Sequence, residues 1–170
     1  SLLCAFAVKL LGQLPVEKNV TKLIKLLEHK HSDVRENVAE ALGNFESEIA
    51  ISTLLSLLED DNLWVRKNAA ISLIENQPAK AIPVLISLLE YDNYLMREEV
   101  AEILGTVNSQ AVIPKLISLL KDEYVDVRCN AAESLGNLEA EAAVGELIAL
   151  LKDKCESVVY IAAEALGKIK

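Results

Sequence analysis

The chain has 170 residues, of which 52% are hydrophobic, only 4% are aromatic and 25% are charged, and its formal net charge is -9. This hydrophobic content excludes a disordered chain, and 6 glycines and 4 prolines are too few for a collagen-like or low-complexity sequence. The acidic excess argues against nucleic acid and anionic membranes as main partners, because both attract clustered positive charge.

The cysteines and the start of the chain indicate where the protein works. Cys4, Cys129 and Cys155 show no CxxC spacing, so they predict neither a disulfide framework nor a zinc ribbon and fit a reducing, cytoplasmic location. The apolar run over residues 2–8 is far shorter than the ~18 residues of a membrane span. We expect no membrane partner and a single repeat domain over residues 1–170.

One segment recurs along the chain with a constant offset of 31 residues. Its six copies begin at residues 2, 33, 64, 95, 126 and 157 and read LLCAFAVKLLG, DVRENVAEALG, WVRKNAAISLI, LMREEVAEILG, DVRCNAAESLG and SVVYIAAEALG. A second segment lies between consecutive copies and begins VTKLIKLLE, ISTLLSLLE, IPVLISLLE, IPKLISLLK or VGELIALLK. A fixed period of this length indicates repeated pairs of elements that stack on one another.

Both segments predict α-helices, because their apolar residues recur at three- and four-residue spacing and strand-like alternation is absent from the sequence. In the copy at 33–43, Val34, Val38 and Leu42 fall on one face. Glycine follows the last apolar residue in five copies, where a left-handed C-terminal cap favours it, and Ile74 interrupts this series. The five are Gly12, Gly43, Gly105, Gly136 and Gly167.

Stacked helix pairs of this kind form an α-solenoid, in this chain of about five and a half repeats, because one pair cannot bury its own apolar face. Solenoids need polar capping repeats, whereas residues 2–8 are entirely apolar. The last copy carries Val159, Tyr160 and Ile161 at positions that are polar in other copies. We therefore expect the chain to be a segment of a longer array or of a larger protein.

The repeated VRxxAAexLG helix, preceded by a helix of the form IPxLIxLLxD, resembles the HEAT-like repeats of the phycobilisome-lyase type over essentially the whole chain. The resemblance implies an all-α fold, an α-solenoid with a right-handed superhelix, whose concave surface is lined by the VRxxAAexLG helices. Such repeats occur in bilin-lyase subunits, in accessory and regulatory proteins, and in sensor arrays attached to signalling ATPases. The resemblance is therefore specific for the fold and leaves the function open.

Four arginines spaced 31 residues apart are predicted to be structural rather than a basic binding stripe. Arg35 lies about 20° from Leu42 on a helical wheel, which is the apolar side of the helix. An acid precedes several of these arginines by six residues, as Asp122 precedes Arg128, and charged groups near a core need such partners. We expect an Asp–Arg ladder that joins the repeats and includes Arg35, Arg66, Arg97 and Arg128. The aliphatic positions Leu23, Leu54, Leu85, Leu116 and Leu147 are predicted core.

The outward face of the VRxxAAexLG helices is the predicted partner-binding surface. It contains the positions equivalent to 33, 36, 37, 40 and 44, which vary between copies while their apolar neighbours do not. Its acids predict attraction of a protein or peptide with a basic segment, and a plain solvated helix face is the alternative. These acids are Glu36, Glu40, Glu75, Glu98, Glu99, Glu102, Glu133 and Glu164, opposed by Lys67 and Lys168. The predicted site comprises Asn37, Glu40, Trp64, Lys67, Asn68, Ile71, Leu95, Glu98, Glu99, Glu102, Asn130 and Glu133.

Two features sharpen the predicted surface. Asn37, Asn68 and Asn130 share one repeat position and resemble the asparagine ladder by which armadillo arrays hold extended peptides, with local capping or solvation as the alternative. Trp64, the single tryptophan, is predicted to form an apolar patch with Leu63, Ile71, Tyr94 and Leu95 and to anchor a partner side chain, with packing against the next repeat as the alternative.

Catalytic and metal-binding patterns do not emerge from the sequence. His29, His31 and Asp33 are a weak candidate for a metal, because their spacing is not a helical i, i+4 pair and the sequence offers no evident fourth ligand. Cys129 is a candidate reactive thiol on the concave face, or an incidental small residue. We predict no catalytic residues, no metal and no cofactor.

The leading hypothesis is a non-enzymatic scaffold that presents an acidic, partly apolar concave groove to a protein or peptide. The alternatives are a subunit of a phycobilin lyase or chromophore-handling complex and the sensor array of a larger signalling ATPase, both from the resemblance. DNA handling, as in HEAT-like alkylpurine glycosylases, ranks last because it needs a basic groove.

Overall fold

A computed structural model describes residues 2–13 and 18–169 of the chain, and all regular structure in this part is helical. The helices are α1 (Leu2–Gln13), α2 (Lys18–Lys25), α3 (Ser32–Gly43), α4 (Glu48–Leu57), α5 (Leu63–Asn76), α6 (Pro78–Leu88), α7 (Tyr94–Leu104), α8 (Ile113–Leu119), α9 (Val125–Asn137), α10 (Val144–Leu150) and α11 (Glu156–Lys168). Single 3₁₀ turns cover Leu26–Glu28, Gln110–Val112 and Glu141–Ala143. The all-α prediction is confirmed, and each VRxxAAexLG copy falls in an odd-numbered helix. The side chains of residues 2–6, with Cys4 and most of the predicted apolar start, lie outside the described part.

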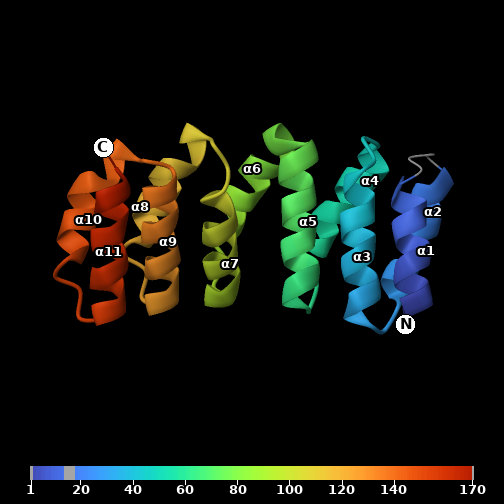
Figure 1. Cartoon of the computed structure of the whole chain (residues 1–170), viewed down its shortest axis with the longest axis horizontal. Coiled ribbons are helices and arrows are strands. Elements are labelled where there is room, and N and C mark those ends of the chain that lie inside the picture. Colours follow the sequence, from blue (N-terminus) through green and yellow to red (C-terminus); the bar gives the residue numbers. More distant parts are fainter. Residues whose placement is uncertain (1, 14–17, 170) are drawn as a thin grey trace. The chain divides into compact units, whose positions relative to one another are not determined.

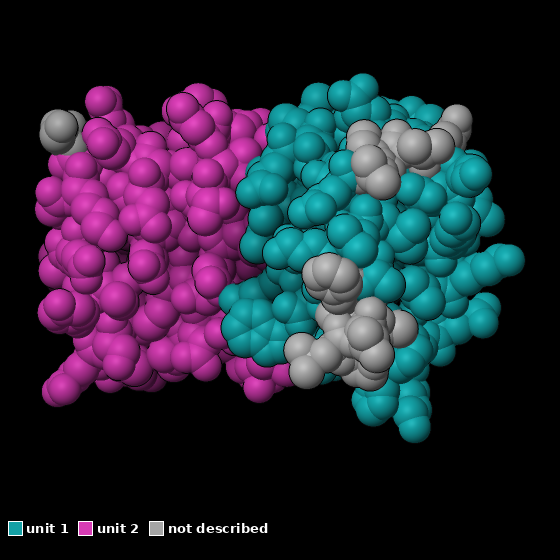
Figure 2. All heavy atoms as spheres, turned by 45° about the vertical axis from the view of Figure 1, so that its right-hand side comes forward, with its two compact units in different colours: residues 1–81 teal, residues 82–170 magenta. Residues whose placement is uncertain are grey.

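The chain divides into two compact units, residues 1–81 and 82–170, coloured separately in Figure 2. In the first unit α1, α3 and α5 stand side by side, with α4 packed against α3 and α5 (Figure 1). In the second unit α7, α9 and α11 stand side by side, with α8 against α9 and α10 against α11 (Figure 1). None of the described helices combines the length and the apolar character that crossing a bilayer requires.

The core of each unit consists of aliphatic side chains at equivalent repeat positions. The five leucines predicted as core, Leu23, Leu54, Leu85, Leu116 and Leu147, are all at most 2% exposed. Alanines fill the close helix contacts between them, as Ala69 and Ala131 do. Low aromatic content follows from this construction, because thin layers of helix pairs leave little room for rings.

The glycine that ends five repeat copies does not act as the predicted left-handed cap. The described glycines all have negative φ, and Gly136 lies inside α9 rather than beyond its end. Gly12, Gly43, Gly105 and Gly136 instead let neighbouring helices approach, since a Cβ at Gly43 would lie 2.8 Å from the Ser72 Cβ, whereas a Cβ at Gly167 would meet nothing within 4 Å. The prediction of left-handed caps is therefore wrong, and close packing is the physical reason for the glycine at these four positions.

Three of the four predicted arginines, Arg35, Arg97 and Arg128, join consecutive repeats, but through a different acid from the one expected, whereas Arg66 donates to the main-chain carbonyls of Asp60 and Asp61. Arg35 donates to both carboxylate oxygens of Asp60 at 2.8 Å, and Arg97 and Arg128 make the same two-pronged contact with Asp122 and Asp153 at 2.8–3.0 Å. The residue six positions before the arginine contributes its main-chain carbonyl, since Arg128 Nη1 donates to the Asp122 oxygen at 2.8 Å. Each carboxylate thus binds the arginine 25 residues earlier, in the preceding repeat.

These ion pairs sit at the edge of the core, and in the Arg35–Asp60 and Arg97–Asp122 pairs the pKa values of both partners are shifted. Burial works against the charged form of Asp60, but hydrogen bonds from Arg35 and from the Asn62 N–H outweigh it and hold the Asp60 pKa below its ordinary value. The pKa of Asp122 is lowered in the same way, against burial, by Arg97 and the Tyr124 N–H. Hydrogen bonds to these carboxylates raise the pKa of Arg35 and Arg97. The Arg35–Asp60 and Arg97–Asp122 pairs are therefore ionised at neutral pH.

Candidate functional site

The outer face of α5 carries the predicted anchor of the first unit. The Trp64 side chain is 59% exposed and Ile71, two helical turns later, is 42% exposed. Residues seven apart lie on the same side of a helix, so the two form one apolar stripe. Lys67 and Asn68 lie between them on this face and are half-buried. Trp64 thus points outward, as predicted for an anchor.

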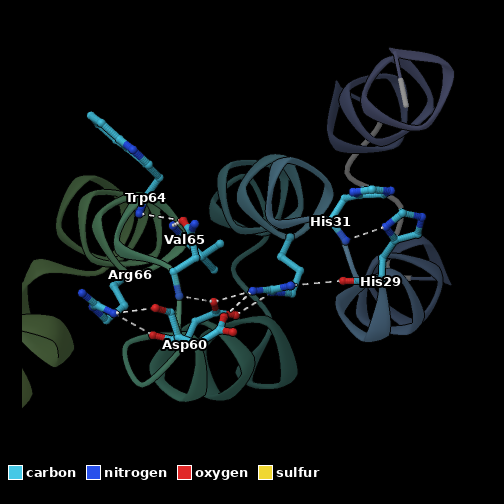
Figure 3. Close-up of polar contacts among 9 residues, drawn as sticks. His29, His31, Asp60, Trp64, Val65 and Arg66 are labelled. Atoms are coloured by element: carbon cyan, nitrogen blue, oxygen red, sulfur yellow. Dashed lines mark hydrogen bonds and ion pairs between the residues drawn. The ribbon is translucent and has the colours of Figure 1, made fainter.

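A series of hydrogen bonds from the preceding repeat positions Trp64. Arg35 of α3 holds the Asp60 carboxylate, whose Oδ1 accepts the Asn62 N–H at 2.9 Å. The Asn62 side chain then caps α5 by accepting the N–H groups of Trp64 at 2.9 Å and Val65 at 3.3 Å. Figure 3 shows the indole projecting away from the polar contacts around Asp60, which lie at the start of the helix. A helix terminus fixed in this way holds the Trp64 backbone in place and so sets the direction in which the side chain leaves the helix.

The asparagines of the predicted ladder bind neighbouring protein atoms. Asn68 Nδ2 on α5 donates to Glu36 Oε1 on α3 at 3.1 Å, and Asn130 Nδ2 on α9 donates to the Glu98 carbonyl on α7 at 3.3 Å. Both amides thus reach the preceding VRxxAAexLG helix of their own unit. Asn37 Nδ2 donates to the Asp33 carbonyl within its own helix at 2.5 Å. The amide nitrogens are therefore engaged in the free protein. A peptide-holding role of these residues stays a prediction.

The acids of the first unit divide into exposed and engaged groups. Glu40 on α3 and Glu75 on α5 are exposed, whereas Glu36 is half-buried and accepts the Asn68 amide. A small cavity of about 170 Å³ between α1 and α3 is lined by Lys9, Gly12, Gln13, Asn37, Glu40, Ala41 and Asn44. The structure thus brings the predicted site residues Asn37 and Glu40 together in one hollow.

In the second unit the predicted face is less acidic than expected. Leu95 is 45% exposed, and Glu102 and Glu133 are exposed, whereas Glu98 is half-buried. Glu99 is only 8% exposed, so its predicted place on the outward face is wrong. The equivalent Asn130 also departs from the predicted face, since its side chain donates to the Glu98 carbonyl of α7.

Salt bridges and ring contacts further change this face. The carboxylate of Glu164 on α11 contacts Lys168, one of the two lysines expected to oppose the acids, at 3.5 Å. Tyr94 is half-buried and stacks on Tyr124, with ring centroids 4.2 Å apart and planes 7° apart. In the second unit, two members of the predicted Trp64 patch, Leu95 and Tyr94, are thus accompanied by Tyr124, which was not predicted and is 39% exposed.

The candidate metal and thiol groups show no special chemistry. His29 Nδ1 accepts the His31 N–H at 3.2 Å, and the two rings lie 5.3 Å apart (Figure 3). Across residues 2–13 and 18–169, groups of three or more His, Cys, Asp and Glu side chains able to hold a metal ion are absent. Burial, with smaller contributions from Cys155 and Asp126, raises the pKa of the half-buried Cys129 thiol, so Cys129 is not the activated nucleophile considered from the sequence.

One basic feature was missed at the sequence level. A cavity of about 550 Å³ in the second unit runs along α10 and past the C-terminal end of α8, and three lysines line it, Lys121, Lys152 and Lys154. The net charge of -9 favours an acidic surface, but one repeat position that is glutamate in the earlier repeats is lysine at 121 and 152. A comparison of charge at each repeat position shows these lysines in the sequence, but not the cavity that they line.

Comparisons with known proteins agree on the architecture. The family model described as HEAT repeats matches residues 3–75, 51–128 and 113–170. Human deoxyhypusine hydroxylase in complex with glycerol is similar with a TM-score of 0.61 and 21% identity, over 99% of this chain and 79% of that chain. The complex of CpcE and CpcF of phycocyanin lyase from Nostoc sp. PCC7120 is similar with a TM-score of 0.56 and 26% identity, over 97% and 70%. A designed armadillo repeat protein is similar with a TM-score of 0.53 and 21% identity, over 98% of this chain and 93% of that chain. A search of curated proteins gave no significant match.

Proposed function

Because the chain belongs to the HEAT-repeat family, we propose that it is a non-enzymatic scaffold that binds a protein or peptide segment on the outer faces of its VRxxAAexLG helices. The observation that carries this proposal is the Trp64–Ile71 stripe on α5. Tryptophan is the residue most enriched among binding hot spots, and an exposed indole beside an exposed isoleucine leaves apolar area that a partner would cover.

Charge selects the partner that this face favours. The exposed acids Glu40 and Glu75 lie on the same unit as Trp64, and Glu102 and Glu133 extend the pattern in the second unit. A segment with lysine or arginine beside an apolar side chain would satisfy both features. The proposed ligand is therefore a basic, partly apolar peptide segment.

The single tryptophan gives a direct readout of this binding. Titration with a peptide of alternating lysine and leucine should shift the Trp64 emission to shorter wavelength, because the ligand removes the indole from water. With a fluorescein-labelled peptide, Trp64→Ala and Glu40→Lys should each weaken binding by about tenfold or more, as expected for a hot spot and a reversed charge.

Matched controls come from the same unit. Ile49 on α4 is 57% exposed, so Ile49→Ala removes a comparable apolar group from another helix and should leave the affinity unchanged. Equal losses in Trp64→Ala and Ile49→Ala, or an unchanged Trp64 spectrum at saturating peptide, would contradict the proposed site.

A second candidate function is a part in bilin attachment, which the likeness to the CpcE–CpcF complex favours. Such a role predicts that the chain changes the absorption spectrum of an added phycobilin. A bilin spectrum that stays the same at equimolar and excess protein would speak against it, whereas peptide binding is measured independently of any chromophore.

A further inference from the structure

We propose that the second unit carries a further binding site, of opposite charge, in which an acidic peptide segment with an apolar side chain binds in the cavity that runs along α10 and past the C-terminal end of α8. The cavity volume of about 550 Å³ lies within the range of known ligand pockets. All of its lining residues fall between 120 and 154, so it is complete within one unit. The proposal goes beyond the scaffold function and does not depend on the Trp64 face.

The base of the cavity is apolar. Leu120 and Leu150 line it and are 3% and 7% exposed, and Ala149 adds an exposed methyl group between them. Gly145 lies in the first turn of α10, where a Cβ would meet nothing within 4 Å. The two preceding repeats place Pro83 and Pro114 at this position. Glycine therefore leaves space above the helix that an apolar ligand side chain can fill.

The rim of the cavity is positively charged. Lys121, Lys152 and Lys154 are exposed, and none of them takes part in an ion pair with any residue of the described ranges. Arg128, by contrast, already binds the Asp153 carboxylate at 3.0 Å and the carbonyls of the preceding loop. Glu146 is the remaining acid of the lining. The cavity thus gathers a local positive charge on a chain whose net charge is -9.

Comparison between the repeats shows that this charge is not required by the fold. Lys121 and Lys152 stand where three earlier repeats carry glutamate, at Glu28, Glu59 and Glu90. A lysine near a helix C-terminus stabilises the helix dipole, but the earlier repeats fold with glutamate at the same position. Lys154 stands at the position of Asp61, Asp92 and Glu123 in three earlier repeats, and the first repeat carries Lys30 there. The reversal of charge is local, and it coincides with the cavity.

The same features favour a peptide over a small phosphate. Phosphate sites commonly use the N–H groups of a helix N-terminus or the two-pronged contact of an arginine. Most of the lining lies along α10 or just after the last turns of α8 and α10, α10 has only seven residues and contributes Gly145 and Glu146 from its first turn, and the arginine of the cavity is already bound to Asp153. Separated lysines around an apolar base instead match carboxylates spaced along a chain with an apolar residue between them.

Fluorescence anisotropy with the whole chain tests the proposal, using a fluorescein-labelled peptide of alternating glutamate and leucine. Lys121→Glu with Lys152→Glu restores the residue of earlier repeats and should weaken binding roughly tenfold or more. Gly145→Phe fills the open space and should weaken binding to a similar extent. A Cβ fits there without a clash, so the variant should keep the helical circular dichroism of the parent.

The matched control is Lys22→Glu with Lys25→Glu, which changes the net charge equally at two exposed positions of α2 in the first unit. The control and Trp64→Ala should both bind the acidic peptide as the parent does. Equal loss in the control, unchanged binding by Gly145→Phe, loss in Trp64→Ala, or displacement of the peptide by equimolar inorganic phosphate would each overturn the proposal. Failure of the lysine–leucine peptide at the Trp64 face would leave this result unaffected.

Discussion

Gly136 lies so close to Ala165 that a Cβ on the glycine would be 2.7 Å from the Ala165 Cα and 2.9 Å from its Cβ. The same relation, 29 positions along the chain, joins Gly12 to Ala41 and Gly105 to Ser134. In each case the nearest atoms of the neighbouring helix include a Cα or a Cβ, and a change of side-chain rotamer cannot move these atoms away. The distance between neighbouring helices is set at these points.

Gly136→Ala should therefore destabilise the protein even though alanine favours helices. Overpacking of a close contact costs about 1–3 kcal/mol, which exceeds the ~1 kcal/mol that alanine gains over glycine in a helix. Urea unfolding followed by circular dichroism measures the change. Gly167→Ala is the matched control, because the equivalent Cβ on α11 meets nothing within 4 Å and only the helix gain remains. Stabilisation by both changes would refute the packing role.

Loss of one rung of the ladder should cost far more than loss of a surface ion pair. Arg97 is 8% exposed, so Arg97→Met leaves the Asp122 carboxylate partly buried without its partner, at a cost of about 3 kcal/mol. Lys115→Met removes the pair with exposed Glu90 and should cost at most ~1 kcal/mol. Equilibrium unfolding of the two variants side by side gives the comparison. Equal losses would mean that the ladder adds no more than a solvated contact.

Stability should fall in acid, because the pKa values of Asp60, Asp122 and Asp153 are lowered in the folded chain. In the unfolded chain these carboxyls titrate near a pH of about 3.9, so as the pH falls through that region the unfolded chain binds more protons than the folded chain does. The contribution of these aspartates to the free energy of unfolding is fully present above the pKa of the unfolded carboxyls, and it is lost as the pH falls through their pKa values in the folded chain. Urea midpoints from pH 7 to pH 3 test this expectation. Asp122→Asn should be less stable at pH 7 and depend less on pH below 4, and a slope equal to that of the parent would contradict the assignment.

Cys129 should react slowly with thiol reagents, because burial raises its pKa and leaves little thiolate at pH 8. A variant with Cys4→Ser and Cys155→Ser isolates this thiol, and serine suits the N-cap position that Cys155 occupies before α11. Its reaction with Ellman's reagent should be several-fold slower in buffer than in urea. Equal rates in the two solvents would show that the folded chain does not protect it.

The period of the sequence predicted the helices well, because spacing within one repeat decides which face is apolar. The predicted copy at 33–43 matches α3, Ser32–Gly43, to within one residue. Relations between repeats were harder to predict. The wheel placed Arg35 on the apolar side but gave no means of choosing among acids, and the partner is Asp60 of the next repeat. Gly43 was read as a cap, although it makes room for Ser72.

The candidate site shows the same division. The outward direction of Trp64 followed from its angle on the helix, which the sequence contains. The burial of Glu99 did not, because a side chain at the edge of a helix face is covered or exposed according to the neighbouring helix. The lysines that line the cavity can be recognised in the sequence as a change of charge between repeats, but the cavity itself arises only from the packing of the helices.

The fixed offsets of 25 residues between arginine and aspartate and 29 between glycine and its contact have a consequence for how such a chain can change length. Inserting a single residue between Asp60 and α5 would displace Gly43 from Ser72 while leaving Arg35 beside Asp60, so two constraints on one helix pair would conflict. Only the addition or removal of a whole 31-residue block keeps both. The packing thus favours duplication of complete repeats as the step by which the array grows, because only a whole repeat preserves both sets of contacts.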